Sequence, residues 1–349
     1  MEPIPQPQAI LTPEEARDRM LRSGFVPQAE AEPRLLDFYG NNDTRSFIMP
    51  GTFAGRRAVC KIIHDPRERD VVGAHQRLHT ASEGTCLRAP RVLYSHADPR
   101  ATLLIMEALP EGTEQLQSPL SDEAREEFLR GPFADVIRIK DKLAYRKLDT
   151  EGKEDGDVID FYGNRLRRWR ALAEGRLTQE RDAEIPPPSL LELADDVAHR
   201  AWNAVNVQYS VEKLRWAYGL SKPDKFHRVG DTYYITDAKL IAPRGEGYEL
   251  AMAVWADAIM PVLWDEALST EAAVAEIERR MKAWTDDWAR ISGEQGLPSY
   301  AEYIPSMFLE RLAGTAYADT LANKKVEPKE AKRRLETLAE LSARLYKTI

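Results

Sequence analysis

The sequence predicts an α+β protein with two lobes, a small antiparallel β-sheet lobe followed by a larger, mainly helical lobe. Between residues 35 and 63, apolar and β-branched stretches alternate with the turn signals GNND and PGTFAG, a pattern typical of antiparallel strands. After residues 110–112, long stretches show helical periodicity instead. One β-rich segment at 226–241 interrupts these helices and predicts a hairpin inside the second lobe.

The elements of the first lobe follow one another in a regular order. Three strands are expected within 35–63, a short helix at 65–79, and two further strands around the turn HADPRA, ending near Leu109. The predicted division of the chain has three parts: an N-terminal helical extension at 1–34, a β-lobe at 35–112, and a helical lobe at 113–349. Residues 218–241 form the hairpin region of the helical lobe, and amphipathic helices follow it.

The composition is that of an ordinary globular protein. The 349 residues are 43% hydrophobic and 30% charged, and this length exceeds one core, which agrees with two lobes. A formal charge of -8 disfavours a nucleic-acid partner held by a basic field. Cys60 and Cys86 stand in no CxxC or Cys/His spacing, so neither zinc nor disulfides are expected. Without a leader-like N-terminus or a run of 18 apolar residues, we expect a cytoplasmic protein with no membrane partner.

Two motifs of the first lobe indicate nucleotide chemistry. The tetrapeptide AVCK, which ends at Lys61, resembles the Val-Ala-x-Lys strand whose lysine contacts the α- and β-phosphates of a nucleotide. The segment LLIMEALPEG at 103–112 combines the last strand of the lobe with a hinge. A solvated lysine and an apolar strand with a turn are the alternatives for each motif alone. Their order, followed by a helical lobe with one hairpin, favours the plan of the kinase fold.

Together these motifs resemble the aminoglycoside phosphotransferase and choline kinase family, whose hinge reads like Leu-Leu-Met-Glu-x-Leu-Pro-Gly. The resemblance covers about residues 35–255 of this chain. The resemblance implies that Lys61 binds phosphates and that Glu68 or Asp70, on the first helix, orients it. A simple Asn/Asp turn is the alternative for the loop at 40–46. The other nucleotide contacts that the resemblance implies are Asn42, Thr44 and Ser46 over the phosphates, and Met106, Glu107, Ala108 and Leu109 beside the adenine.

The second lobe departs from the family where the catalytic loop is expected. The family carries His-Gly-Asp-Leu-x-x-x-Asn, and this chain reads YGLSKPDK, followed after the hairpin by ITD and GYELA. In this register Leu220 replaces the catalytic aspartate and Lys225 the metal-binding asparagine, while Asp237 keeps the place of a metal ligand. Leucine cannot orient a hydroxyl, and the Lys225 ammonium cannot bind Mg²⁺, although it can replace part of a metal's charge against phosphate. Asp224 is the nearby carboxylate that can serve as a relocated base.

The resemblance implies an ATP- and Mg²⁺-dependent phosphotransferase that acts on a small-molecule hydroxyl with an impaired or altered catalytic loop. ATP or another nucleoside triphosphate is the expected cofactor. The first alternative is a pseudokinase, a regulatory module that binds a nucleotide or a protein partner without phosphotransfer. The second is a helical scaffold with no nucleotide site. The six histidines are scattered and are expected on the surface or in packing.

Overall fold

The computed structural model describes residues 11–28, 34–36, 46–64, 71–143, 158–175, 186–208, 215–219, 221–236, 241–323 and 325–349. Its α-helices are α1 (Pro13–Arg22), α2 (Val71–Ala81), α3 (Asp122–Phe128), α4 (Ala134–Ile139), α5 (Val158–Ala173), α6 (Pro188–Gln208), α7 (Tyr248–Val254), α8 (Met260–Leu263), α9 (Thr270–Gln295), α10 (Ile304–Gly314) and α11 (Pro328–Tyr346). Its strands are β1 (Phe25–Pro27), β2 (Arg34–Leu36), β3 (Ser46–Phe53), β4 (Arg56–Ile63), β5 (Leu87–Arg88), β6 (Val92–Ala97), β7 (Thr102–Glu107), β8 (Glu114–Gln115), β9 (Arg215–Tyr218), β10 (Phe226–Val229), β11 (Thr232–Ile235) and β12 (Ile241–Arg244).

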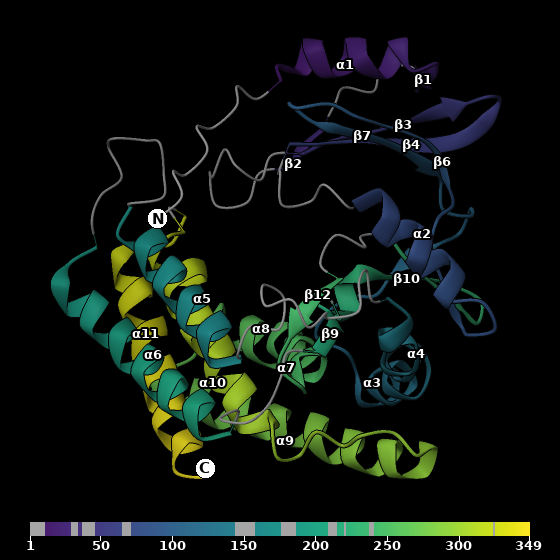
Figure 1. The fold of residues 1–349 in the computed structure, drawn as a ribbon. Coiled ribbons are helices and arrows are strands. Elements are labelled where there is room, and N and C mark those ends of the chain that lie inside the picture. The colour runs from purple at the N-terminus through teal and green to yellow at the C-terminus, as the bar shows by residue number, and fades with distance from the viewer. Residues whose placement is uncertain are drawn as a thin grey trace.

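The first lobe is an antiparallel sheet in which five strands run in the order β1-β3-β4-β7-β6, while β2 pairs with β3 beside them. The five predicted strands, β2, β3, β4, β6 and β7, and the helix α2 are confirmed. β1 is an addition, because it follows α1 in a segment predicted to be only helical and pairs with the edge of β3. Figure 1 shows α1 on the outer face of this sheet and α2 on the face toward the helical lobe.

Strand alternation separates the side chains of the sheet into two layers. Successive residues of a strand point to opposite faces. Cys60 of β4 therefore packs in one cluster with Met20 of α1, whereas Ile63 packs in another with Val71 of α2. Lys61 has the same parity as Ile63, so its side chain leaves the sheet on the side of the second lobe.

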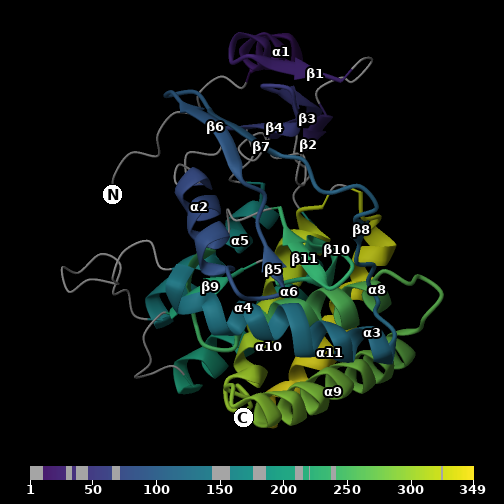
Figure 2. The same ribbon diagram turned by 90° about the vertical axis from the view of Figure 1, so that its right-hand side faces the viewer.

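A second sheet lies between the first lobe and the helices. Its strands run in the order β5-β11-β10-β8, with β5 parallel to β11 and the other pairs antiparallel. The predicted hairpin is confirmed as β10 and β11, which turn at Gly230 with a φ of 54°. Figure 2 shows this sheet below the first lobe, beside the short helices α3 and α4. The hairpin is thus part of a four-stranded sheet that lies under the β-lobe. The strands β9 and β12 form a separate pair.

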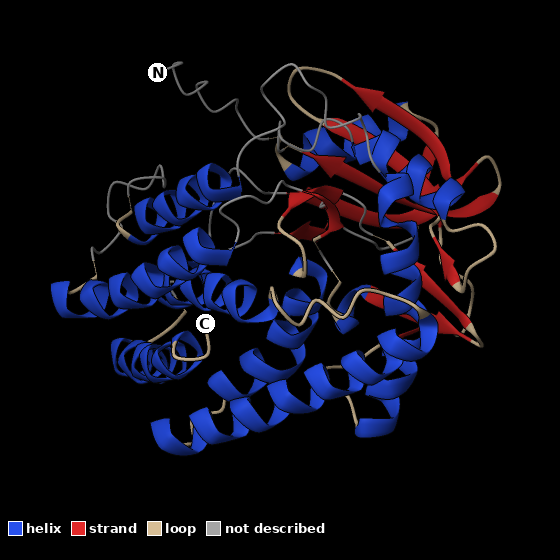
Figure 3. Cartoon of the chain, turned by 60° about the horizontal axis from the view of Figure 1, so that its bottom comes forward, coloured by secondary structure: helices blue, strands red, loops and turns tan. Residues whose placement is uncertain are grey.

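Long helices form the body of the second lobe, as the predicted periodicity requires (Figure 3). Their apolar faces meet in one core that also receives the inner face of the hairpin. The buried indole of Trp288 on α9 packs edge-on against Phe133, with ring centroids 4.8 Å apart. Such buried aromatic pairs fix the helices that support the loops of the cleft. No helix in the described part of the chain is long and apolar enough to cross a membrane.

Candidate functional site

Lys61 reaches from the first lobe to the backbone of the second. Its Nζ donates a hydrogen bond of 2.9 Å to the carbonyl oxygen of Thr236. Thr236 directly follows β11, and Asp237 comes next in the chain. The contact therefore brings the predicted phosphate-binding lysine to the segment that carries the predicted metal ligand.

Six residues of the predicted site region lie outside the described ranges: Asn42, Thr44, Glu68, Asp70, Leu220 and Asp237. Their predicted roles remain predictions, and the choice between Glu68 and Asp70 stays open. Ser46 is described as the first residue of β3, where it is buried opposite Ile63 of β4. Met106, at the end of β7, is also buried.

The hinge backbone has fewer available donors than the resemblance implies. The Glu107 amide donates to the Arg91 carbonyl at 2.9 Å, and the Ala108 amide donates to the Arg57 carbonyl at 3.1 Å. The Leu109 amide makes no hydrogen bond with any described residue. Of the three predicted hinge amides, Leu109 is therefore the one available to a nucleobase edge.

Asp224 and Lys225 form an ion pair in the short turn Pro223–Lys225. The Lys225 Nζ lies 3.3 Å from the Asp224 Oδ2. The other oxygen, Oδ1, is buried and accepts no hydrogen bond within the described chain. The side-chain amide of Gln115 donates to the Asp224 carbonyl oxygen at 2.5 Å, which ties the turn to β8. The predicted base and the predicted nucleotide contact thus neutralise each other in part.

His227 belongs to the cleft, although the sequence predicts only a surface or packing role for it. Its neighbour Phe226 is buried in the helical core, so alternation on β10 points His227 toward the other face of the sheet. Burial lowers the pKa of His227, and so do the charges of Lys225 and Lys61, while Asp224 raises it. The two lysines therefore approach this half-buried imidazole from opposite lobes. Alternation along β10 indicates which face of the sheet carries His227, but only the packing of the first lobe over that face places it near Lys61.

Among the described residues, two lysines offer positive charge for phosphate groups. Lys61 and Lys225 bring two positive charges to the face of the sheet that carries His227. The part of the chain that the structure describes has no cluster of three or more His, Cys, Asp or Glu side chains suited to a metal. Asp237, the predicted metal ligand, lies outside that part. When bound, Mg²⁺ would supply charge neutralisation between phosphates, and Asp237 is the residue that would hold it.

The start of α7 supports both sides of the loop. The Ser221 hydroxyl donates to the Glu249 carbonyl oxygen at 2.7 Å. Burial raises the pKa of the Glu249 carboxyl to about 7, although the charge of Lys140 and backbone hydrogen bonds, including one from Tyr218, lower it. Tyr218 and Ser221 lie on either side of position 220, where the resemblance places a catalytic aspartate in the family. Glu249 is therefore bonded to both sides of this loop.

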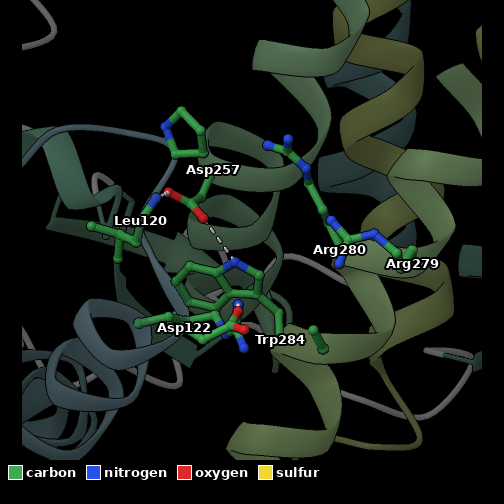
Figure 4. A pocket seen from close by; sticks show the side chains of 9 residues that line it. Leu120, Asp122, Asp257, Arg279, Arg280 and Trp284 are labelled. Atoms are coloured by element: carbon green, nitrogen blue, oxygen red, sulfur yellow. Dashed lines mark hydrogen bonds and ion pairs between the residues drawn. The ribbon is translucent and has the colours of Figure 1, made fainter.

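A cavity of about 130 Å³ lies away from the cleft, between the start of α3 and α9 (Figure 4). The buried carboxylate of Asp257 accepts hydrogen bonds from the Leu120 amide at 2.8 Å and from the Trp284 indole at 3.0 Å. Arg279 and Arg280 at the rim both bind Glu276. Because hydrogen bonds within the chain already engage these charged groups, the residues of this cavity do not indicate a ligand.

Comparison with known proteins places the fold. No family model and no curated protein matches the chain. Choline kinase from Cryptosporidium parvum Iowa II is similar with a TM-score of 0.56 at 10% identity, over 96% of this chain and 97% of that one. Amicoumacin kinase hAmiN, solved with AMP-PNP, Ca²⁺ and Ami, gives 0.54 at 12% identity, over 95% and 92%. A thermostable mutant of aminoglycoside phosphotransferase APH(4)-Ia, solved with ADP and hygromycin B, gives 0.52 at 11% identity, over 94% and 97%.

The chain therefore has the bilobal, kinase-like α+β fold of small-molecule phosphotransferases. This result confirms the resemblance drawn from the hinge and the lysine strand at the level of the fold. At identities of 10–12%, the likeness extends to the architecture alone. The function has to be argued from the residues of the cleft.

Proposed function

We propose that the chain binds a nucleoside triphosphate between its lobes and transfers phosphate only very weakly or not at all. The observation that carries this proposal is the hydrogen bond from Lys61 to Thr236 across the cleft. A lysine amine held at Thr236 can also reach the phosphate of a nucleotide that is bound beside this segment. Nucleotides bound to structures of the same fold support the proposal.

Weak transfer follows from the composition of the loop. Leu220 offers no group that can accept a proton, and the loss of a positioned acid or base typically lowers a rate by about 10²–10⁴-fold. Lys225 places a fixed positive charge where a metal ligand is expected, and its partner is Asp224. Phosphoryl transfer depends on positioning as well as on charge neutralisation. With no residue to orient the acceptor hydroxyl, a cationic site can bind the phosphates without driving their transfer.

Calorimetric titration with ATP tests the proposal. We expect saturable binding to the wild type and at least a tenfold weaker affinity for Lys61→Met, which keeps the length of the stem but removes the charge. Lys282→Met is the matched control, because Lys282 is an exposed lysine of α9 that pairs with Asp286. Equal ATP affinity in the two variants would refute a nucleotide site at Lys61.

A further inference from the structure

Arg311 of α10 is a buried cation that has no carboxylate partner in the described part of the chain. Only 6% of the residue is exposed, and its Nε makes no hydrogen bond within the described chain. No described carboxylate forms an ion pair with this guanidinium. Arg165, on the neighbouring α5, shows the ordinary arrangement, because its Nε lies 2.9 Å from the buried Glu310 Oε1. Charged side chains are almost never buried unless they are paired.

A second unpaired cation, Lys222, converges on the same aromatic ring as Arg311. The Lys222 Nζ lies 5.3 Å from the ring centroid of Trp255, and the Arg311 Cζ lies 4.8 Å from it. The Trp255 indole N–H donates to the Thr315 hydroxyl at 2.7 Å, which fixes the ring. Lys222 directly precedes the turn Pro223–Lys225 of the cleft. Two cations and one fixed indole thus meet beside the loop.

The carboxylates whose charges act on Lys222 do not form an ion pair with it among the described residues. Burial lowers the pKa of Lys222, the charges of Asp224 and Asp319 raise it, and those of Lys225 and Arg311 lower it. Asp224 pairs with Lys225 instead. Neither acid lies within ion-pairing distance of Lys222 among the described residues. The two converging cations therefore repel each other in a poorly solvated place.

Aromatic contacts offset only part of this cost. The Arg311 guanidinium also lies 5.5 Å from the Trp169 ring centroid, so two indoles stabilise it through their π faces. Such contacts are weaker than the loss of hydration of a buried ion. An anion between Lys222 and Arg311 would supply the missing charge and the missing hydrogen-bond acceptor together.

We propose that Lys222 and Arg311, beside Trp255, bind the oxyanion group of a small molecule other than the nucleotide. A guanidinium pairs with a phosphate or carboxylate through parallel N–H groups, while a lysine adds a point charge. The Trp255 ring supplies an apolar wall for the body of the ligand. This goes beyond the proposed function, because Lys61 serves the nucleotide from the first lobe, whereas Arg311 approaches the loop from the helices of the second.

Thermal unfolding of the full chain with inorganic phosphate tests this site without nucleotide. Ionic strength is held constant with chloride, so that only specific binding distinguishes the samples. A ligand that binds only the folded state stabilises it by RT ln(1 + [L]/Kd) and so raises the melting temperature. We expect phosphate to raise the melting temperature of the wild type, with at least a tenfold loss of apparent affinity in Arg311→Met and in Lys222→Met. Arg311→Lys should keep part of the effect. Arg200→Met is the control, since Arg200 is bonded to Ser342 at 3.0 Å on another face of the lobe.

Further outcomes of the same measurement decide the source of the anion. A phosphate effect that persists in Lys61→Met supports a site apart from the nucleotide cleft, and one lost only in Lys61→Met overturns it. A phosphate effect that saturating ATP abolishes would assign the site to the nucleotide's own phosphates and overturn a second ligand. No phosphate effect in the wild type, or an effect in Arg311→Met and Lys222→Met as large as that in the wild type, would also overturn the proposal. ATP affinity, measured separately, reports on the nucleotide proposal alone.

Discussion

The Lys61 amine donates to the Thr236 carbonyl across a separation of 175 residues. Lys61 lies on the inner face of the first sheet, and Thr236 directly follows the hairpin of the second. This hydrogen bond therefore joins the two lobes at the cleft. It also brings the amine to the residue that directly precedes Asp237, whose role as a metal ligand stays a prediction.

The first prediction concerns catalysis. Wild-type ATP turnover with common hydroxyl acceptors should be absent or very weak, and Leu220→Asp combined with Lys225→Asn should raise it, because the pair restores a proton acceptor and a metal ligand. The measurement is steady-state ADP release in the presence of Mg²⁺. An ordinary kinase rate in the wild type, abolished by Asp224→Ala, would instead identify Asp224 as a relocated base.

The second prediction is a pH dependence of stability set by Glu249. Burial raises the pKa of this carboxyl to about 7, from 4.5 in the unfolded chain, so the folded state holds the proton more tightly. Its stabilising contribution is complete below pH 4.5 and is lost as the pH rises through 7, by on the order of 3 kcal/mol. Urea unfolding between pH 4.5 and 7.5 should show this slope in the wild type and a flatter one in Glu249→Gln. Equal slopes would contradict the assignment.

The third prediction compares two arginines of the helical lobe, Arg165 and the buried Arg311. Arg165→Met should lower the free energy of unfolding by about 3–5 kcal/mol, because it leaves the buried Glu310 carboxylate without its partner. Arg311→Met should leave the free energy of unfolding unchanged or raise it, because it removes an unpaired charge and leaves no bare carboxylate behind. Denaturant unfolding of the ligand-free chain measures both. A large loss in Arg311→Met would reveal a partner that the described contacts lack.

The fourth prediction concerns the cavity beside α9. Asp257→Ala should cost about 1–3 kcal/mol for each of the two buried donors that it leaves unsatisfied, the Leu120 amide and the Trp284 indole. Trp284→Phe removes one donor together with its need for an acceptor, so combining it with Asp257→Ala should cost less than the sum of the two changes. Additive losses in a double-mutant cycle would show that the indole contact contributes nothing.

Local patterns predicted the first lobe well. The alternation of apolar residues and the turn signals located five strands, and the same alternation directs Lys61 toward the second lobe. β1 escaped prediction because it has only three residues and exists through its pairing with β3. A strand so short has no period of its own, and tertiary pairing decides its structure.

The charged groups of the second lobe were not predictable in the same way. His227 has a cleft position only because the first lobe lies over its sheet, which no local pattern encodes. Lys222 and Arg311 are 89 residues apart in numbering, and their convergence on Trp255 depends on how α10 packs beside the loop. The sequence does show the substitutions at Leu220 and Lys225, because a motif keeps its spacing when its residues change.

The nucleotide proposal is tested most directly by the ATP dissociation constant measured with Mg²⁺ and again with excess EDTA. The charges of Lys61 and Lys225 both act on His227, although Asp224 partly neutralises Lys225, so the phosphates have cationic partners without a metal ion. We predict that ATP binds in both conditions and that removing Mg²⁺ weakens its affinity by less than tenfold. Binding that disappears in EDTA, or no binding in either condition, would contradict a cleft in which lysines take over part of the metal's charge.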